Sequence, residues 1–284
     1  MLINKVTKPH FILKKMNNIQ GIAQEILSSG NQNEIEYFNF HKRRYERFES
    51  FLNIHFSQKS NNPKLKVLDI GSHYLHSSMI LANLDFNVDG MDVSEFWKME
   101  FVKSRGERYG IHPVVEDDLS GMSAFEHVTD KYDLVVFTEI MEHITFNPIM
   151  FWKRIYQILK PGGKIYLSTP NAFALPNYVR NLKNLLFMKS IGITVEDILS
   201  KVTYGHHWKE YSAQEIKIYF QKLSPDFEVM IHPYYYSNYE LKPPHFLFKL
   251  LSRIGNKTQR FAGDLEVIVT LRQKSRWTIR EPEY

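Results

Sequence analysis

Five short runs rich in β-branched and aromatic residues alternate with helical segments through the middle of this 284-residue chain. The runs cover residues 66–70, 87–93, 112–115, 132–137 and 164–168. Alternation of strand and helix at this spacing predicts a parallel sheet with helices on both faces, the doubly wound α/β class. Two later runs, at residues 227–232 and 266–272, extend the prediction to a mostly parallel sheet of seven strands.

A polar N-terminal segment precedes this alternation. Aromatic and apolar residues recur there at steps of three and four, which predicts a helix over residues 34–56. The recurring positions are Phe38, His41, Tyr45, Phe48, Leu52 and Phe56. We expect residues 1–62 to form a helical cap, residues 63–272 to form the main domain, and the charged residues 273–284 to form a loosely held tail.

The alternation breaks after the fifth run. Residues 171–211 contain irregular helical segments, and we expect them to form an insertion that covers the functional edge of the sheet as a lid. The next helix, over residues 212–223, opens with Ser212 and, three residues later, Glu215, which is the pattern of a capping box.

The composition excludes several kinds of chemistry. Cysteine is absent, so the chain has no thiolate nucleophile, disulfide or iron–sulfur cluster, and any metal ligands must be His, Asp or Glu. The longest apolar run near the N-terminus, residues 11–13, is too short for a signal peptide, and no run of 18 apolar residues occurs. These features predict a cytoplasmic protein. The net charge of +5, spread over 36 basic and 31 acidic residues, disfavours nucleic acid as a partner.

Small and acidic residues stand at the ends of the first four predicted strands. In open parallel sheets, ligands bind beyond the carboxyl ends of the strands. Gly71 closes the first strand and permits a tight turn, and Asp92 at the tip of the second could accept both hydroxyls of a ribose. The alternative for Asp92 is a helix N-cap before Ser94. The third and fourth strands are followed by residues 116–119 and 138–139.

In these segments the chain resembles the class I S-adenosylmethionine-dependent methyltransferases, from Val67 to Arg272. The matching motifs are VLDIGS at 67–72, GMDVS at 90–94, EDDL at 116–119, YDLVVFTEIMEH at 132–143 and LKPGGKIYLSTPN at 159–171. The resemblance implies a Rossmann-like fold and an S-adenosylmethionine cofactor. It implies contacts from Asp69, Gly71 and Ser72 to the methionine end, from Asp92 and Val93 to the ribose, from Asp118 and Leu119 to the adenine, and from Thr138 and Glu139 near the sulfonium.

The opening loop departs from the family pattern. The family loop usually carries two more glycines, and this chain has His73 and Leu75 at those places. Side chains there narrow the approach to the cofactor, so the loop must take another path. We expect a variant loop that still binds the cofactor. The alternative is a loop that no longer binds it, which would make the chain a non-catalytic scaffold domain.

A second acidic and histidine-containing group follows the fourth strand. If a helix begins near Glu139, then Glu139, Glu142 and His143 lie on one face, a set that suits a divalent cation such as Mg²⁺. A further ligand could come from residues 205–212. The group resembles sites in small-RNA 2′-O-methyltransferases and ubiquinone-pathway O-methyltransferases. The first branch points to His207 and the second to His206, and we favour His207. The alternatives are that His143, with His207, serves the reaction as a base or substrate contact without metal, or that the group is structural.

The acceptor is the least constrained part of the function. Methyl transfer to a hydroxyl needs alignment and removal of a proton, so we expect O-methylation of a small-molecule, glycan or lipid-linked acceptor, with RNA 2′-O-methylation as the alternative. The insertion, the N-terminal helix and the aromatic residues 234–239 could roof a pocket. Residues 243–260 are apolar with basic flanks and could contact a membrane surface peripherally. The sequence indicates no oligomeric state.

Overall fold

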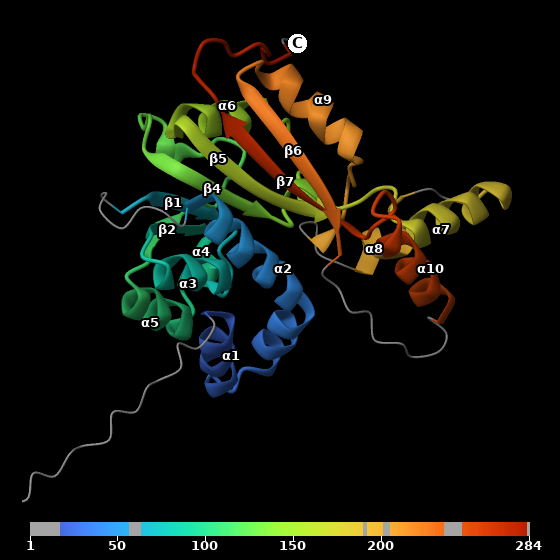
Figure 1. Cartoon of the computed structure of the whole chain (residues 1–284), viewed down its shortest axis with the longest axis horizontal. Helices are drawn as coiled ribbons and strands as arrows, with labels where there is room; N and C mark the ends of the chain where they lie inside the picture. Colours follow the sequence, from blue (N-terminus) through green and yellow to red (C-terminus); the bar gives the residue numbers. More distant parts are fainter. Residues whose placement is uncertain (1–17, 57–63, 190–191, 201–204, 236–245, 283–284) are drawn as a thin grey trace, which may run out of the picture.

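The computed structural model describes residues 18–56, 64–189, 192–200, 205–235 and 246–282. Its centre is a seven-stranded sheet with the order β3-β2-β1-β4-β5-β7-β6 (Figure 1). The strands are β1 (Lys66–Ile70), β2 (Asn87–Asp92), β3 (His112–Val115), β4 (Tyr132–Thr138), β5 (Leu159–Pro170), β6 (Phe227–Tyr234) and β7 (Asp264–Leu271). The neighbours from β3 to β5 pair in parallel, while β7 runs antiparallel to both β5 and β6. The predicted mostly parallel, seven-stranded sheet is confirmed.

Helices cover both faces of this sheet. They are α1 (Asn18–Ser28), α2 (Gln32–Phe56), α3 (His76–Asn83), α4 (Ser94–Trp97), α5 (Glu100–Tyr109), α6 (Ile149–Ile158), α7 (Leu175–Leu186), α8 (Val195–Ser200), α9 (Ala213–Leu223) and α10 (Phe246–Lys257), with the 3₁₀ turns η1 (Ser123–Phe125) and η2 (Met141–His143). Successive residues of a strand point to opposite faces. Leu68 and Val135 therefore join a core with α6 and α9, whereas Val67 and Leu134 join a second core with α1, α2 and α3.

The two N-terminal helices pack on one face of the sheet. Helix α2 begins two residues before the predicted start at residue 34 and ends at the predicted residue 56. The rings of Phe48 and Phe51 lie 4.9 and 4.6 Å from the ring of Tyr166 on β5. Residues 1–17 and 57–63 of the expected cap lie outside the described residues.

The segment after β5 forms α7 and α8, as the irregular helical pattern of the insertion predicts. Helix α7 packs closely on α10, where a Cβ atom added to Gly255 would lie 2.9 Å from the Leu175 Cβ. The capping box at the start of α9 is confirmed, because the Ser212 side chain accepts from the Glu215 amide and the Glu215 side chain accepts from the Ser212 amide. Within the described residues, no helix has both the length and the apolarity to cross a membrane.

The C-terminal tail differs from the expectation of a loosely held segment. Asp226 accepts hydrogen bonds from the amides of Ser275 and Arg276, at 2.8 and 2.9 Å. The Thr278 amide donates to the Leu223 carbonyl, and the Trp277 ring packs against the ring of Tyr156 at 5.6 Å. The expectation was wrong because it rested on charge alone. A buried carboxylate at the start of β6 and an aromatic residue in the tail attach the tail to the domain.

Candidate functional site

The loop between β1 and α3 adopts a left-handed backbone at alternate residues. The angle φ is +69° at Gly71, +48° at His73 and +66° at Leu75. Only glycine takes this conformation without cost, and another residue in it costs roughly 1–2 kcal/mol. The chain therefore follows a glycine-like path without the two glycines that the family pattern leads one to expect. Gly71 itself is required, because a Cβ atom there would lie 2.5 Å from the Ile140 side chain.

Neither the His73 nor the Leu75 side chain is free to turn into the space beyond the ends of the strands. The Leu75 side chain is fully buried in the core that α1 and α2 cover. The His73 ring lies against the rings of Tyr37, Tyr74 and Phe96, with centroids 4.7, 3.8 and 4.4 Å away. The bulk that the sequence places at these two positions is thus packed against protein.

Asp92 is tied directly to this loop. Its Oδ2 accepts from the His73 amide at 2.6 Å, and its Oδ1 accepts from the Val93 amide at 2.8 Å. Burial raises the pKa of this carboxyl. Asp92 does not act as the N-cap before Ser94, because the Ser94 amide donates to Asp117 at 2.7 Å. The Asp92 carboxylate stays at the strand tip with capacity for further donors.

Asp69 and Ser72 lie on the inner side of the same turn. Asp69 is buried and accepts from the Ser78 hydroxyl at 2.6 Å, and burial raises its pKa to about 7. The Ser72 amide donates to the Met91 carbonyl, while its hydroxyl is buried near Gly90 and has no hydrogen-bond partner among the described residues. Ser72 therefore presents its backbone, rather than its hydroxyl, at this edge.

The third strand end carries one exposed and one buried acid. Asp118 is exposed, and its Oδ1 accepts from the amide and hydroxyl of Ser120, which lowers the pKa of the carboxyl. Glu116 is buried and accepts from the Ala124 amide at 3.1 Å. Leu119 is half-buried and packs on the apolar core. These residues form a loop at the tip of β3, beside the tip of β2 that Asp92 occupies.

The helix expected from Glu139 does not form. Glu139 has φ of +56°, and its amide donates to the Ser168 carbonyl at 2.8 Å, so the β4–β5 pairing continues one residue past Thr138. The Glu139 side chain accepts from the Ser168 hydroxyl at 2.7 Å. Only the single 3₁₀ turn η2 follows, and α6 starts after Pro148. The prediction of a helix start at Glu139 was wrong, because the spacing of acidic residues over five positions does not show that the pairing of β4 with β5 continues there.

Three of the four proposed metal-ligating side chains nevertheless converge. One ligand atom each from Glu142, His143 and His207 lies within 4.8 Å of the others, and Glu139 is not part of this group. The His143 and His207 rings meet edge to face at 4.9 Å. The neighbouring His206 is buried and packs on Trp208 instead. We call Glu142, His143 and His207 the polar triad.

The hydrogen bonds of Glu142 and His143 leave one atom of each side chain available. Glu142 is fully buried; its Oε2 accepts from the Thr169 hydroxyl at 2.9 Å, and its Oε1 accepts no hydrogen bond from the described residues. Burial, and then the charge of Glu139, raise its pKa well above the ordinary value. The His143 Nδ1 lies 2.9 Å from the His206 carbonyl, so it carries the proton and leaves Nε2 with a lone pair. Burial lowers the pKa of His143.

The polar triad faces a cavity of about 980 Å³. Several residues of its wall carry no signal in the sequence, among them Tyr37, Phe40, Arg180, Asn181 and Asn256. His41, one of the recurring positions of the predicted N-terminal helix, also lines it. His41 lies on the apolar stripe of α2. The pattern of that stripe does not distinguish residues that pack on the sheet from residues that line a cavity beside it. Tyr235 lines the cavity, whereas residues 236–239 of the expected aromatic roof lie outside the described residues.

Solved structures share this fold. The 1,6-didemethyltoxoflavin-N1-methyltransferase of Burkholderia thailandensis, solved with S-adenosylhomocysteine, aligns with a TM-score of 0.52 at 10% identity, covering 96% of this chain and 94% of that one. An S-adenosylmethionine-dependent methyltransferase of Mesorhizobium loti aligns with a TM-score of 0.50 at 14% identity, covering 73% and 91%. At these identities the likeness concerns the fold alone.

Matches in sequence, unlike the matches in fold, identify the family. Ubiquinone biosynthesis O-methyltransferase of Pseudomonas fluorescens is 25% identical over 187 residues, which is 58% of this chain and 75% of that protein. The enzyme of the same name from Caulobacter vibrioides is 30% identical over 155 residues, so the chain spans only 55% of that relative. The methyltransferase domain family matches residues 40–224. Since this match covers more than half of the chain, the protein belongs to that family and is a class I S-adenosylmethionine-dependent methyltransferase.

Proposed function

We propose that this methyltransferase transfers the methyl group to a hydroxyl of a small-molecule, glycan or lipid-linked acceptor. The observation that carries the proposal is the polar triad in the wall of a cavity that follows β4. A hydroxyl is a poor nucleophile until a base or a cation prepares it, and the triad offers both an imidazole lone pair and a carboxylate. The similar Pseudomonas and Caulobacter proteins are named O-methyltransferases, which supports the same reaction type.

We assign the cofactor to the tips of β1 to β4. S-adenosylmethionine supplies a methyl group that the positive sulfonium already activates. In the proposal, the loop at Asp69, Gly71 and Ser72 receives the methionine end. Asp92 with Val93 takes the ribose hydroxyls. Asp118 with Leu119 takes the adenine, and Thr138 with Glu139 borders the reacting centre.

In this proposal His143 removes the acceptor proton. Its Nδ1–H is held by the His206 carbonyl, so Nε2 is fixed as the accepting nitrogen. Burial lowers its pKa, which keeps the imidazole neutral and able to accept a proton at neutral pH. The Glu142 Oε1 lies 3.9 Å from that nitrogen.

We propose a divalent cation in the polar triad as the alternative way of activating the hydroxyl, in which His143 Nε2 would be a ligand and not the base. One carboxylate oxygen and two imidazole nitrogens form a common ligand set, and the buried Glu142 Oε1 lacks the hydrogen bond that a buried oxygen normally has. A bound cation would lower the pKa of an acceptor hydroxyl.

If the cation activates the hydroxyl, we expect chelation to lower the methyl-transfer rate by roughly tenfold or more, because the loss of a Lewis acid removes several kcal/mol of charge stabilisation. The measurement compares rates before and after treatment with a chelator, with Mg²⁺, Mn²⁺ and Zn²⁺ added back in turn. S-adenosylhomocysteine binding, measured on the same samples, serves as the control and should not change. An unchanged rate in metal-free protein would reject the cation and leave His143 as the base.

The charge around the cavity disfavours RNA as the acceptor. Arg180 and Lys209 lie in the wall together with Glu139, Glu210 and Asp264. A phosphate backbone needs a dense basic surface, and acidic groups beside it repel it. The wall of the cavity therefore favours a small-molecule, glycan or lipid-linked acceptor over RNA.

A lipid-linked acceptor agrees with the surface of the helices beside the cavity, of which α7 and α10 contribute to its wall. Helices α7, α8 and α10 lie at the same end of the molecule (Figure 1), and large apolar side chains on them and on the two residues after α7 are exposed. These are Leu182, Leu185, Leu186, Phe187, Met188, Val195, Leu199, Phe246, Leu247, Leu250 and Ile254. Lys183, Lys249 and Arg253 lie on the same helices. Apolar residues with basic neighbours favour the surface of an anionic bilayer.

We expect the protein to co-sediment with vesicles that contain anionic lipid, and less with neutral vesicles. Changing Leu186 and Leu247 to Glu should weaken this partitioning at least about tenfold, since burying one leucine contributes about 1.5–3 kcal/mol. Leu27→Glu, at an exposed leucine of α1, is the matched control. Equal sedimentation of all variants would contradict this surface, and the small-molecule and glycan acceptors would remain.

A further inference from the structure

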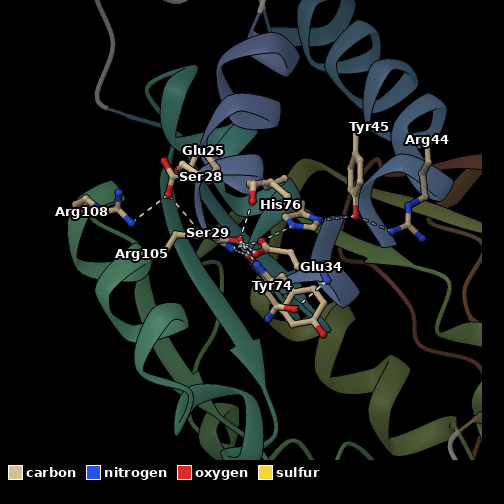
Figure 2. Close-up of polar contacts among 12 residues, drawn as sticks. Glu25, Ser28, Ser29, Glu34, Arg44, Tyr45, Tyr74, His76, Arg105 and Arg108 are labelled. Carbon is tan, nitrogen blue, oxygen red and sulfur yellow. Dashed lines mark hydrogen bonds and ion pairs between the residues drawn. The ribbon is translucent and has the colours of Figure 1, made fainter. Parts of the chain in front are cut away.

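A buried carboxylate on the N-terminal cap binds residues on both sides of the left-handed loop. Glu34 of α2 is fully buried (Figure 2). Its Oε1 accepts from the His76 Nε2 at 2.9 Å and from the Arg105 guanidinium, and its Oε2 accepts from the Ser29 hydroxyl at 2.9 Å. Glu34 thus joins the turn between α1 and α2 to the first residue of α3 and to α5.

Both main partners of Glu34 also hold the loop. Arg105 donates to the Tyr74 carbonyl at 2.8 Å, immediately before the left-handed Leu75. His76 follows Leu75, and its Nδ1 accepts from the Tyr45 hydroxyl at 3.1 Å. Glu34 therefore holds the backbone before Leu75 through Arg105, and it binds the side chain after Leu75 directly.

Further groups of the cap support this arrangement. Glu25 of α1 accepts from the Arg105 Nε at 3.3 Å and from Arg108 at 3.1 Å. Arg44 donates to the Tyr45 hydroxyl at 3.2 Å. Figure 2 shows these side chains pointing toward one another from α1, α2, α5 and the loop. The network is ionic and buried, so the loss of one member leaves a charge without a partner.

The loop needs such support because of its sequence. His73 and Leu75 lack the freedom of glycine, and without outside contacts they would relax out of the left-handed region. The His73 amide is one of the two donors to Asp92, so relaxation of the loop would also change the carboxylate at the tip of β2.

We propose that Glu34 is a positioning residue for the cofactor loop, and that the N-terminal cap, through Arg105 and His76, holds His73 and Leu75 in a left-handed backbone that glycine alone adopts without cost. The inference rests on the proposed cofactor site at the strand tips. It assigns α1 and α2 to the methyltransferase site and not only to the covering of the core.

The test is a calorimetric titration of full-length variants with S-adenosylhomocysteine, with the melting temperature measured on each. Glu34→Gln keeps the shape and removes the charge, and it should raise the dissociation constant about tenfold, within the usual range of coupling between linked sites. Glu36→Gln, on the exposed side of the same helix, is the charge-matched control and should bind like the wild type.

Combination with changes at His73 separates positioning from a general structural role. His73→Gly removes both the ring and the cost of the left-handed backbone, whereas His73→Ala removes the ring and keeps the cost. The tenfold effect of Glu34→Gln should persist in the alanine background and fall to roughly threefold or less in the glycine background. Equal effects in both backgrounds, or no effect of Glu34→Gln in the folded protein, would overturn the inference.

A second variant and the binding of the wild type complete the experiment. If Glu34→Gln does not fold, Arg105→Lys replaces it, because lysine keeps a positive charge and loses the planar guanidinium that bonds Glu25 through Nε and both Glu34 and the Tyr74 carbonyl through Nη1. If the wild type does not bind S-adenosylhomocysteine, the proposed cofactor site itself fails. If the wild type binds and only the pattern of variants is wrong, the positioning role alone fails.

Discussion

Replacing Asp92 with asparagine is expected to weaken the binding of S-adenosylhomocysteine by one to two orders of magnitude, because hydrogen bonds to a charged group contribute about 1.5–3 kcal/mol each. Asp92 already accepts from the amides of His73 and Val93, and we assign the ribose hydroxyls to its remaining lone pairs. Asparagine keeps the size but has one accepting oxygen, so it cannot serve both amides and the ribose.

Calorimetric titration measures this effect. Asp117→Asn is the matched control, because Asp117 is an exposed carboxylate at the same sheet edge and caps Ser94 instead of facing the loop. Its affinity should stay within about twofold of the wild type. Wild-type affinity in a folded Asp92→Asn variant would remove Asp92 from the cofactor site.

The second large effect is expected at His143. His143→Ala should lower the turnover number by about 10²–10³-fold, the usual contribution of a positioned base, with little change in S-adenosylhomocysteine affinity. The assay follows a labelled methyl group into an acceptor fraction from cell extract, with the product identified by mass. His112→Ala, at an exposed histidine of β3, is the control. A variant that retains the wild-type turnover would contradict the role of base.

The same side chain predicts a pH dependence. A base must be neutral, and burial lowers the pKa of His143 from its ordinary value of 6.5. The wild-type turnover should therefore be flat above that value and should fall only as the pH drops through the lowered pKa. A fall that begins well above pH 6.5 would indicate a different group.

The sheet could be predicted because each strand is a local pattern. β1 and β4 are short apolar runs between helical segments, and the capping box of α9 needs only Ser212 and Glu215. The strand-end position of Asp92 follows from the same pattern, because a parallel sheet brings the carboxyl ends of its strands to one edge.

The remainder depends on contacts that local patterns do not contain. Glu139 resembles a helix start, but Ser168, 29 residues later, extends the strand pairing past it. Glu34 and Arg105 are 71 residues apart, and each alone resembles a solvated charge on a helix. The burial of Leu75 depends on α1 and α2. The sequence therefore shows a leucine where a glycine is expected, but it does not show the contacts that hold this leucine in place.

The central claim is that the tips of β1 to β4 form a cradle for an adenosine-bearing ligand although His73 and Leu75 stand in the loop. The most direct measurement is a calorimetric titration of the wild-type protein with S-adenosylhomocysteine. We predict one binding site with a micromolar dissociation constant. A folded protein that releases no heat and shows no rise in melting temperature with this ligand would contradict the claim and favour a non-catalytic scaffold domain.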